Sequence, residues 1–170
     1  MQTIKDINLL TKKEFLSIFG NIFEKSEWIA EETFGLKPFK NPKDLIYKMM
    51  NIYENTSNEN VKIIFKLHPK LAIETKLTSF SSNEQSSAKL DACTNQELEE
   101  FKELNLSYEK KFEFPFIIAV KGKNKNEILN NFRRRIKNDL EEEFIEAKTQ
   151  VKKIALFRLN EVLNINYENI

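Results

Sequence analysis

This chain of 170 residues has very little of the usual metal-binding and redox side chains, with one cysteine, Cys93, and one histidine, His68. A single cysteine excludes an intramolecular disulfide, and the two residues together exclude a Cys/His structural zinc site, which needs four ligands. No second histidine is present to activate Cys93, so a thiol nucleophile is not expected. The sequence predicts no metal site.

Glycine and proline are also scarce, with three and four copies. All-β sandwiches need many tight turns, and turns consume glycine. The low glycine count therefore favours long helices with short connections. Phenylalanine is abundant instead, with 14 copies, and supplies large apolar anchors for packing between helices.

The chain also lacks an excess of charge of either sign, because its 27 Lys and Arg residues are nearly balanced by 26 Asp and Glu residues. This balance gives no indication of a nucleic-acid or membrane surface. The first residues lack the long apolar run of a signal peptide or membrane anchor. The last residues lack a Ser-Lys-Leu type of targeting signal. The cytoplasm is the simplest predicted location.

Local signals for helix starts recur along the chain. An Asn-Pro pair at 41–42 fits a helix N-terminus, and capping-box patterns occur at Thr11/Glu14, Ser81/Glu84, Thr94/Glu97 and Asn124/Glu127. Apolar residues follow at helical spacing, for example Phe15, Ile18, Phe19, Ile22 and Phe23. The run 114–120 is continuously apolar beside a proline, so a short strand and a buried extended segment both remain open. We predict an all-α fold: one multi-helix bundle domain over 1–170 with one short extended segment.

His68 shares a helical face with Val61, Ile64 and Phe65 and directly precedes Pro69. A residue before proline is pushed out of helical geometry, so His68 is predicted at a helix end. Partly desolvated there, it could exchange protons near neutral pH; alternatively it simply bonds backbone or water. Glu84 could close a capping box or serve a ligand at a helix N-terminus, with the Gln85 amide beside it.

Arginine occurs in two unusual settings, on an apolar helix face and in a cluster of three. Arg158 lies on an apolar helix face with Ile154, Ala155 and Val162, where it needs a carboxylate, carbonyls or an anionic ligand. Glu84 is one candidate partner. The cluster Arg133–Arg135 suggests nucleic-acid binding, but Phe132 and Ile136 predict that it is a solvated face, and the acidic run 141–143 cancels its local charge.

Segments spread over nearly the whole chain resemble one known family. They are Leu67-His68-Pro69-Lys70-Leu71-Ala72, Leu77-Thr78, Ser81-x-x-Glu84-Gln85, Ala88-Lys89-Leu90-Asp91, Phe101 to Asn105, Tyr108 to Phe116, Ile128-Leu129, Phe132, Arg135, Asn138, Glu143, Ala147, Ile154-Ala155 and Arg158-Leu159. The family is 2-oxo-4-hydroxy-4-carboxy-5-ureidoimidazoline (OHCU) decarboxylase. Lys89 and Glu113 stand where its pattern usually has glycine, and the stretch between His68 and Ser81 is shorter than in many members.

The resemblance implies an all-α homodimer without metal or organic cofactor that converts OHCU to S-allantoin and CO2. It implies His68 and Glu84 as catalytic residues. It also implies substrate-binding positions at Pro69, Ser81, Ser82, Asn83, Gln85, Ile117, Ile118, Ala119, Val120 and Arg158.

In the mechanism that follows from the resemblance, His68 transfers a proton and Glu84 bonds either His68 or the substrate ring. Gln85 and the 117–120 backbone fix the ring, and Arg158 neutralises Glu84 or substrate charge. The group that protonates the carbanion is left open. Two alternatives remain: a helical nucleic-acid- or protein-binding module using Arg133–Arg135, and a family member with a changed reaction.

Overall fold

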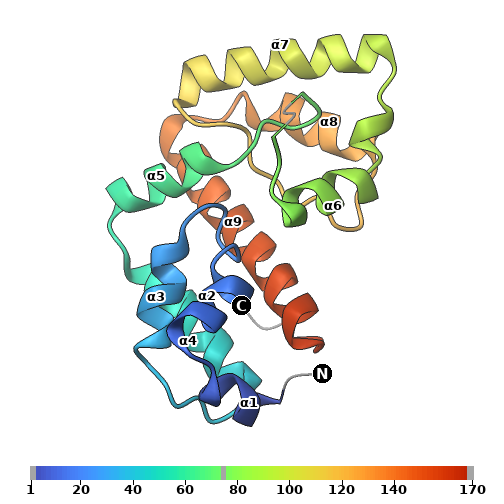
Figure 1. Cartoon of the computed structure of the whole chain (residues 1–170). Helices are drawn as coiled ribbons and strands as arrows, with labels where there is room; N and C mark the ends of the chain where they lie inside the picture. Colours follow the sequence, from blue (N-terminus) through green and yellow to red (C-terminus); the bar gives the residue numbers. More distant parts are fainter. Residues whose placement is uncertain (1–2, 74–75, 168–170) are drawn as a thin grey trace. The chain divides into compact units, whose positions relative to one another are not determined.

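The computed structural model describes residues 3–73 and 76–167, and over these residues it contains nine α-helices, one 3-10 helix and no β-strand (Figure 1). The chain divides into two compact units. The first comprises the residues up to Leu67 and those from Lys152 onward, and the second runs from His68 to Val151. The helix α9 (Leu140–Leu163) contributes residues to both. The predicted all-α class is confirmed.

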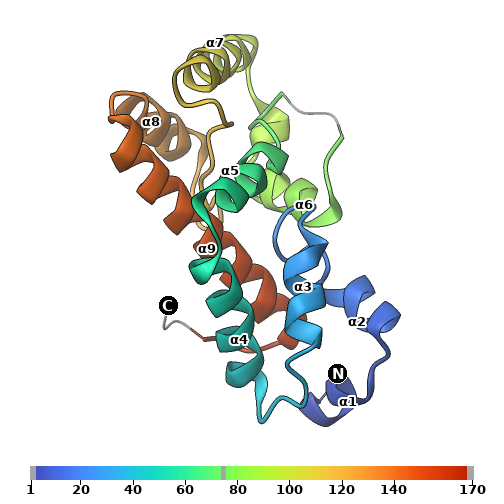
Figure 2. The same cartoon turned by 90° about the vertical axis from the view of Figure 1, so that its left-hand side faces the viewer.

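The first unit contains five helices before the last one. They are α1 (Ile4–Leu9), α2 (Lys12–Phe19), α3 (Glu27–Phe34), α4 (Pro42–Asn55) and α5 (Asn58–Leu67). The helix α3 packs against both α2 and α4, and Figure 2 shows it next to α4. The Thr11/Glu14 capping box and the Asn41 cap with Pro42 at the first helical position are both present, as predicted.

The apolar stripe predicted after Thr11 runs from Phe15 to Phe23 and extends beyond the end of the helix α2. The helix α2 ends at Phe19, with Gly20 as its C-cap. Ile22 and Phe23 are buried, but they lie in the turn that follows. Their burial therefore comes from tertiary packing of an irregular segment and not from helical periodicity.

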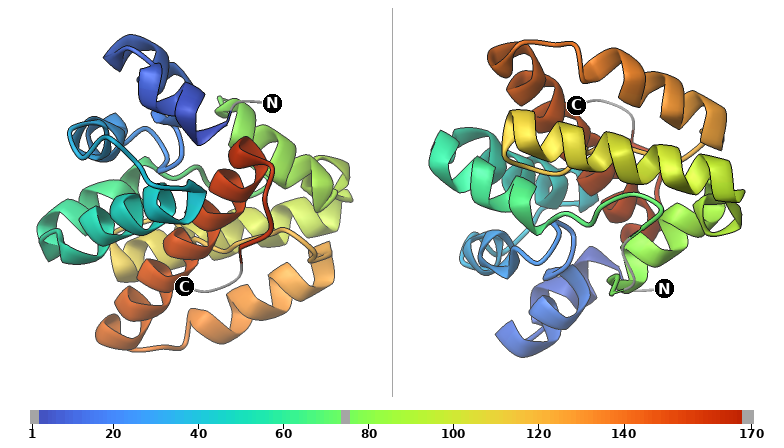
Figure 3. Two further views of the ribbon diagram at one scale, coloured as in Figure 1. Left: turned by 90° about the horizontal axis from the view of Figure 1, so that it is seen from below. Right: turned by 90° about the horizontal axis from the view of Figure 1, so that it is seen from above.

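The second unit holds α6 (Ser79–Ser87), the 3-10 helix η1 (Leu90–Ala92), α7 (Asn95–Phe112) and α8 (Lys125–Arg135), with the first half of α9. The helices α7 and α8 lie side by side in both views of Figure 3. Capping boxes at Thr94/Glu97 and Asn124/Glu127 begin α7 and α8, as predicted. Stacked rings of Phe116 and Phe132, with centroids 3.9 Å apart, form part of the core.

The apolar run at 114–120 connects α7 to α8, and the structure resolves the choice that periodicity left open. All seven residues are buried and none belongs to a strand. This stretch is the predicted extended segment, so its backbone polar groups need partners outside a β-ladder.

The two positions that depart from the glycine of the family pattern both have left-handed backbone. Lys89, before η1, has φ 57°, and Glu113, the C-cap of α7, has φ 63°. L-residues with a Cβ atom are strained in this region, whereas glycine is not. The departures therefore change local stability, and both side chains are exposed.

We expect Lys89→Gly and Glu113→Gly each to raise the free energy of unfolding by about 0.5–1 kcal/mol, since relief of left-handed strain exceeds the added chain entropy of glycine. Urea denaturation measures the change. Gly122 is the reverse control, because it has φ 77° and open space where a Cβ would lie: Gly122→Ala should lose stability. Lower stability in both glycine variants would contradict the strain argument.

Candidate functional site

The helix α5 leads directly to His68 at the start of the second unit. The helix ends at Leu67, immediately before His68, so the predicted helix-end position is confirmed. The His68 side chain is buried, with 8% exposed, and Pro69 beside it is half-buried. An imidazole in this setting is shielded from bulk water while its backbone is outside regular helix.

The helix α6 carries the predicted block Ser81 to Gln85, but the predicted capping box at Ser81/Glu84 is wrong. Thr78 is the N-cap, and its side chain accepts a hydrogen bond from the Ser81 N–H. Ser81 and Glu84 therefore lie within the helix. The solvent exposure of these α6 residues differs: Ser81 and Gln85 are buried, Glu84 is half-buried, and Ser82 and Asn83 are exposed.

Two buried amides hold the loop after His68. The Ala72 N–H donates to Gln85 Oε1 at 3.0 Å, and Asn105 Nδ2 donates to the Leu71 carbonyl at 3.2 Å. Ala72 has a left-handed backbone, with φ 64°, which these bonds help to fix. Gln85 Nε2 and Asn105 Oδ1 are buried and have no partner within residues 3–73 and 76–167. The Gln85 amide thus has a spare donor beside the His68 loop.

Side chains of α8 and α9 hold the extended segment. Arg135 Nη1 donates to the Ile117 carbonyl at 2.7 Å, and the Ala119 N–H donates to Gln150 Oε1 at 2.9 Å. The Arg135 guanidinium also lies over the Phe116 ring, 4.5 Å from its centroid. Ile117, Ile118, Ala119 and Val120 are all buried, so the segment has a defined position in this unit.

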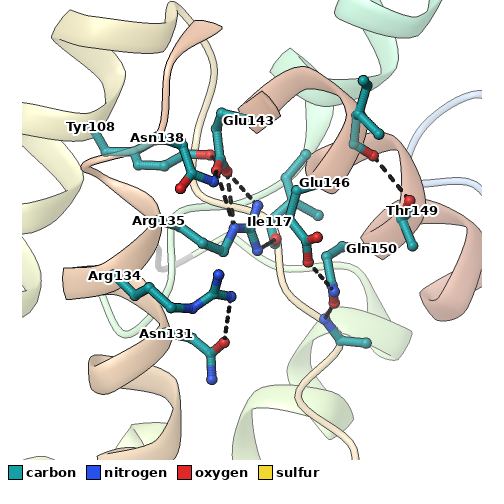
Figure 4. A network of polar contacts seen from close by, with 12 residues as sticks. Tyr108, Ile117, Asn131, Arg134, Arg135, Asn138, Glu143, Glu146, Thr149 and Gln150 are labelled. Atoms are coloured by element: carbon teal, nitrogen blue, oxygen red, sulfur yellow. Dashed lines mark hydrogen bonds and ion pairs between the residues drawn. The ribbon is translucent and has the colours of Figure 1, made fainter. Parts of the chain in front are cut away.

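A buried ion pair anchors Arg135 (Figure 4). Its Nε lies 3.0 Å from Glu143 Oε1, and the two side chains are 1% and 0% exposed. The Tyr108 hydroxyl donates to the same carboxylate, and Asn138 Nδ2 donates to it at 2.8 Å. Burial raises the pKa of Tyr108 above its usual range, although the charge of Arg135 opposes this. Tyr108 therefore acts as a neutral donor.

The arginine cluster differs from its predicted solvated face at one position. Arg133 and Arg134 are exposed, but Arg135 is buried in the Glu143 ion pair. Arg133 pairs with Glu100 at 2.6 Å. The cluster therefore presents no surface of three adjacent arginines, because the apolar residues of α8 share their buried face with Arg135.

Arg158 lies on α9 within the first unit. Its side chain is 2% exposed, and its Nη1 lies 3.0 Å from Glu24 Oε2. The same nitrogen donates to the Asn21 carbonyl at 3.1 Å. Of the partners that the sequence left open for Arg158, the structure shows a carboxylate and a carbonyl, and the carboxylate belongs to Glu24, which no sequence pattern indicated.

The described residues give little support for a thiol nucleophile, a metal site or a membrane-spanning helix. Burial raises the pKa of the Cys93 thiol, against the opposing charge of Lys125, so its reactive thiolate is disfavoured. The described residues contain no group of three or more His, Cys, Asp or Glu arranged to hold a metal ion. Among the described helices, none is both long and apolar enough to span a membrane.

Comparison with known sequences bears directly on this arrangement. The sequence model of the family OHCU decarboxylase matches residues 8–160, which include every candidate site residue. This chain belongs to the OHCU decarboxylase family. It is 35% identical over 159 residues to the 2-oxo-4-hydroxy-4-carboxy-5-ureidoimidazoline decarboxylase of Haloferax volcanii, covering 94% of this chain and 95% of that protein.

A longer relative and two solved structures are also similar to this OHCU decarboxylase family member. The chain is 38% identical over 170 residues to the uric acid degradation bifunctional protein of Bacillus sp. TB-90, covering 99% of this chain but 34% of that protein. It thus spans about a third of that relative's length. A crystal structure of (S)-allantoin synthase matches with TM-score 0.73 and 28% identity, over 95% of this chain and 54% of that one. A crystal structure of OHCU decarboxylase in the presence of (S)-allantoin matches with TM-score 0.71 and 25% identity, over 89% and 97%.

The structure brings together residues that no sequence pattern connected. Gln150 and Arg135 contact the 117–120 segment, and Glu143 and Tyr108 hold Arg135. Helical spacing contained a signal for Arg135, because it lies three residues after Phe132 and seven after Ile128, both buried. The same kind of spacing that marks Arg158 therefore also marks Arg135.

Proposed function

We propose that this chain catalyses the cofactor-independent decarboxylation of OHCU to S-allantoin and CO2 in urate degradation. The observation that carries the proposal is the family match, because it extends over 8–160 and includes all the proposed site residues. Relatives named for this decarboxylase and for uric acid degradation support it. The reaction makes the enzyme a carboxy-lyase.

The chemistry suits the residues available. Loss of CO2 leaves an electron pair on a ring carbon of OHCU, and the adjacent carbonyl and imine groups can delocalise it. An electron-sink cofactor is then unnecessary. The protein must hold the ring, orient the departing carboxylate and deliver one proton to one face of the ring.

In this proposal His68 transfers the proton, and Glu84 bonds either His68 or the ring. Gln85 offers its spare Nε2 donor to the ring, since its Oε1 is already committed to the Ala72 N–H. Arg158, which is itself paired with Glu24, is proposed to neutralise the charge of Glu84 or of the substrate. The substrate is lined by Pro69, by the α6 residues Ser81, Ser82 and Asn83, and by the backbone of 117–120.

We further propose that residues 1–170 act as one OHCU decarboxylase domain, assembled as a homodimer in the cytoplasm and without affinity for nucleic acid. The internal position of Arg135 supports the last point, because it removes one charge from the only arginine triplet in the sequence. Sedimentation equilibrium measures the assembly, and a salt-dependent DNA affinity would argue against this part.

The purified chain is expected to turn freshly made OHCU into S-allantoin and to keep its rate after exhaustive chelation. Spontaneous decay yields racemic allantoin, so circular dichroism of the product separates the enzymatic flux from the background. A heat-denatured sample is the control. A racemic product would indicate a changed reaction. An activity that chelation removes and added metal restores would contradict the cofactor-free mechanism, since carboxylates alone can bind some metals.

A further inference from the structure

One edge of the 117–120 segment is tied to two helices. The Ile117 carbonyl accepts a hydrogen bond from Arg135 of α8, and the Ala119 N–H donates to Gln150 of α9. In an extended chain, the carbonyl of one residue and the N–H of the second residue after it point to the same side. Figure 4 shows Arg135 and Gln150 approaching the segment from these two helices.

The opposite edge of the segment carries the backbone N–H and carbonyl of Ile118. Its side chain is buried, with 4% exposed, yet no hydrogen bond joins its N–H or carbonyl to another residue of 3–73 or 76–167. Buried backbone groups are nearly always paired. This edge therefore offers one donor and one acceptor side by side, which is the complement of the N–H and carbonyl groups of a ureide ring.

The orientation of the Gln150 amide is fixed by a second contact. Gln150 Nε2 donates to Glu146 Oε1 at 2.8 Å, one turn earlier on α9. An ionised carboxylate can only accept hydrogen bonds, so Glu146 selects the amide nitrogen and turns Gln150 Oε1 toward the Ala119 N–H. Gln150 is itself buried, with 8% exposed.

We propose that Gln150, oriented by Glu146, is a positioning residue that holds the 117–120 backbone so that the Ile118 N–H and carbonyl face the substrate ring. The inference rests on the proposed function, because it assumes that OHCU lies along this segment. Gln150 has no role in proton transfer. Its effect is on how tightly and on which face the ring is held.

The first test is Gln150→Leu, which keeps a similar volume but removes the acceptor for the Ala119 N–H. The KM for OHCU is expected to rise roughly five- to tenfold, as for one lost hydrogen bond, with a smaller change in kcat. The S-excess of allantoin, extrapolated to high enzyme concentration, should fall because the ring is held less firmly. A residue that only stabilises the fold would leave this excess unchanged.

The matched rescue is the double variant Glu146→Gln with Gln150→Glu. It keeps the net charge, and the carboxylate at 150 can accept from both the Ala119 N–H and the amide at 146. The KM and the S-excess should return toward wild type. Thr149→Ala is the control, because Thr149 is exposed and its hydroxyl donates only to the Ile145 carbonyl of its own helix.

Hydrogen exchange gives a readout that needs neither activity nor a variant. The Ala119 amide of the wild type should exchange far more slowly than the amide of exposed Gly122. Equal exchange rates would overturn the inference, as would a folded Gln150→Leu variant with wild-type KM and S-excess. A wild-type protein that makes no S-allantoin would overturn the proposed function instead, while slow Ala119 exchange would still report the hydrogen bond.

Discussion

His68→Asn is expected to lower the rate of S-allantoin formation by about 10²–10⁴-fold, the usual contribution of a general acid–base group. This corresponds to a barrier increase of about 3–5 kcal/mol. Asparagine keeps a polar side chain of similar reach but cannot shuttle a proton near pH 7. The variant should therefore unfold near the wild-type temperature, and circular dichroism of product from fresh OHCU measures the loss.

The matched control for His68 is Lys66→Asn, an exposed position on the last turn of α5, the helix that precedes His68. It should keep wild-type kinetics, because it alters the helix end without touching the buried imidazole. Wild-type S-allantoin production by His68→Asn would mean that the histidine is a packing residue. The mechanism would then have to be rebuilt around Glu84.

Arg158→Leu is expected to reduce the free energy of unfolding by about 3–5 kcal/mol, the cost of removing one partner of a buried ion pair. Glu24, 1% exposed, would keep its charge without the guanidinium 3.0 Å away. The Asn21 carbonyl would lose a donor too. Urea denaturation measures the stability, and kinetics below the transition test whether substrate handling also weakens.

Two companion variants separate the ion pair from other effects of the Arg158 substitution. Glu24→Leu combined with Arg158→Leu removes both charges and should recover much of the lost stability, since a buried pair replaced by apolar residues is often neutral. Lys153→Leu removes an exposed cation from the same helix and should change stability by less than about 0.5 kcal/mol. An Arg158→Leu variant as stable as Lys153→Leu would rule out a stabilising ion pair.

Helix starts were predictable wherever one local signal had no competitor. The caps at Thr11, Thr94 and Asn124 each follow from two residues three positions apart. Near Ser81 several hydroxyl residues compete, and the true cap is Thr78. The helix α3 was not predicted, because Ser26 makes no side-chain cap bond and its apolar face is weakly marked.

The contacts of the candidate site were harder to predict from the sequence, because they join residues that are far apart along the chain. Ala119 and Gln150 are separated by 31 residues, and Arg135 reaches back 18 residues to Ile117. A family pattern marks such residues but does not say which atoms meet. His68 was different, because the apolar spacing of α5 and the following proline together determine a buried helix end.

The buried Arg135–Glu143 pair has a consequence for how this sequence can change over generations. Losing either partner alone strands a charge in the core, whereas losing both for apolar residues is often tolerated. Tyr108 and Asn138 also donate hydrogen bonds to the Glu143 carboxylate. Loss of Glu143 alone would therefore leave these two donors without their acceptor as well. We therefore expect positions 135 and 143 to change together during evolution. A single substitution at either position would destabilise the protein, whereas a paired substitution to apolar residues would be tolerated.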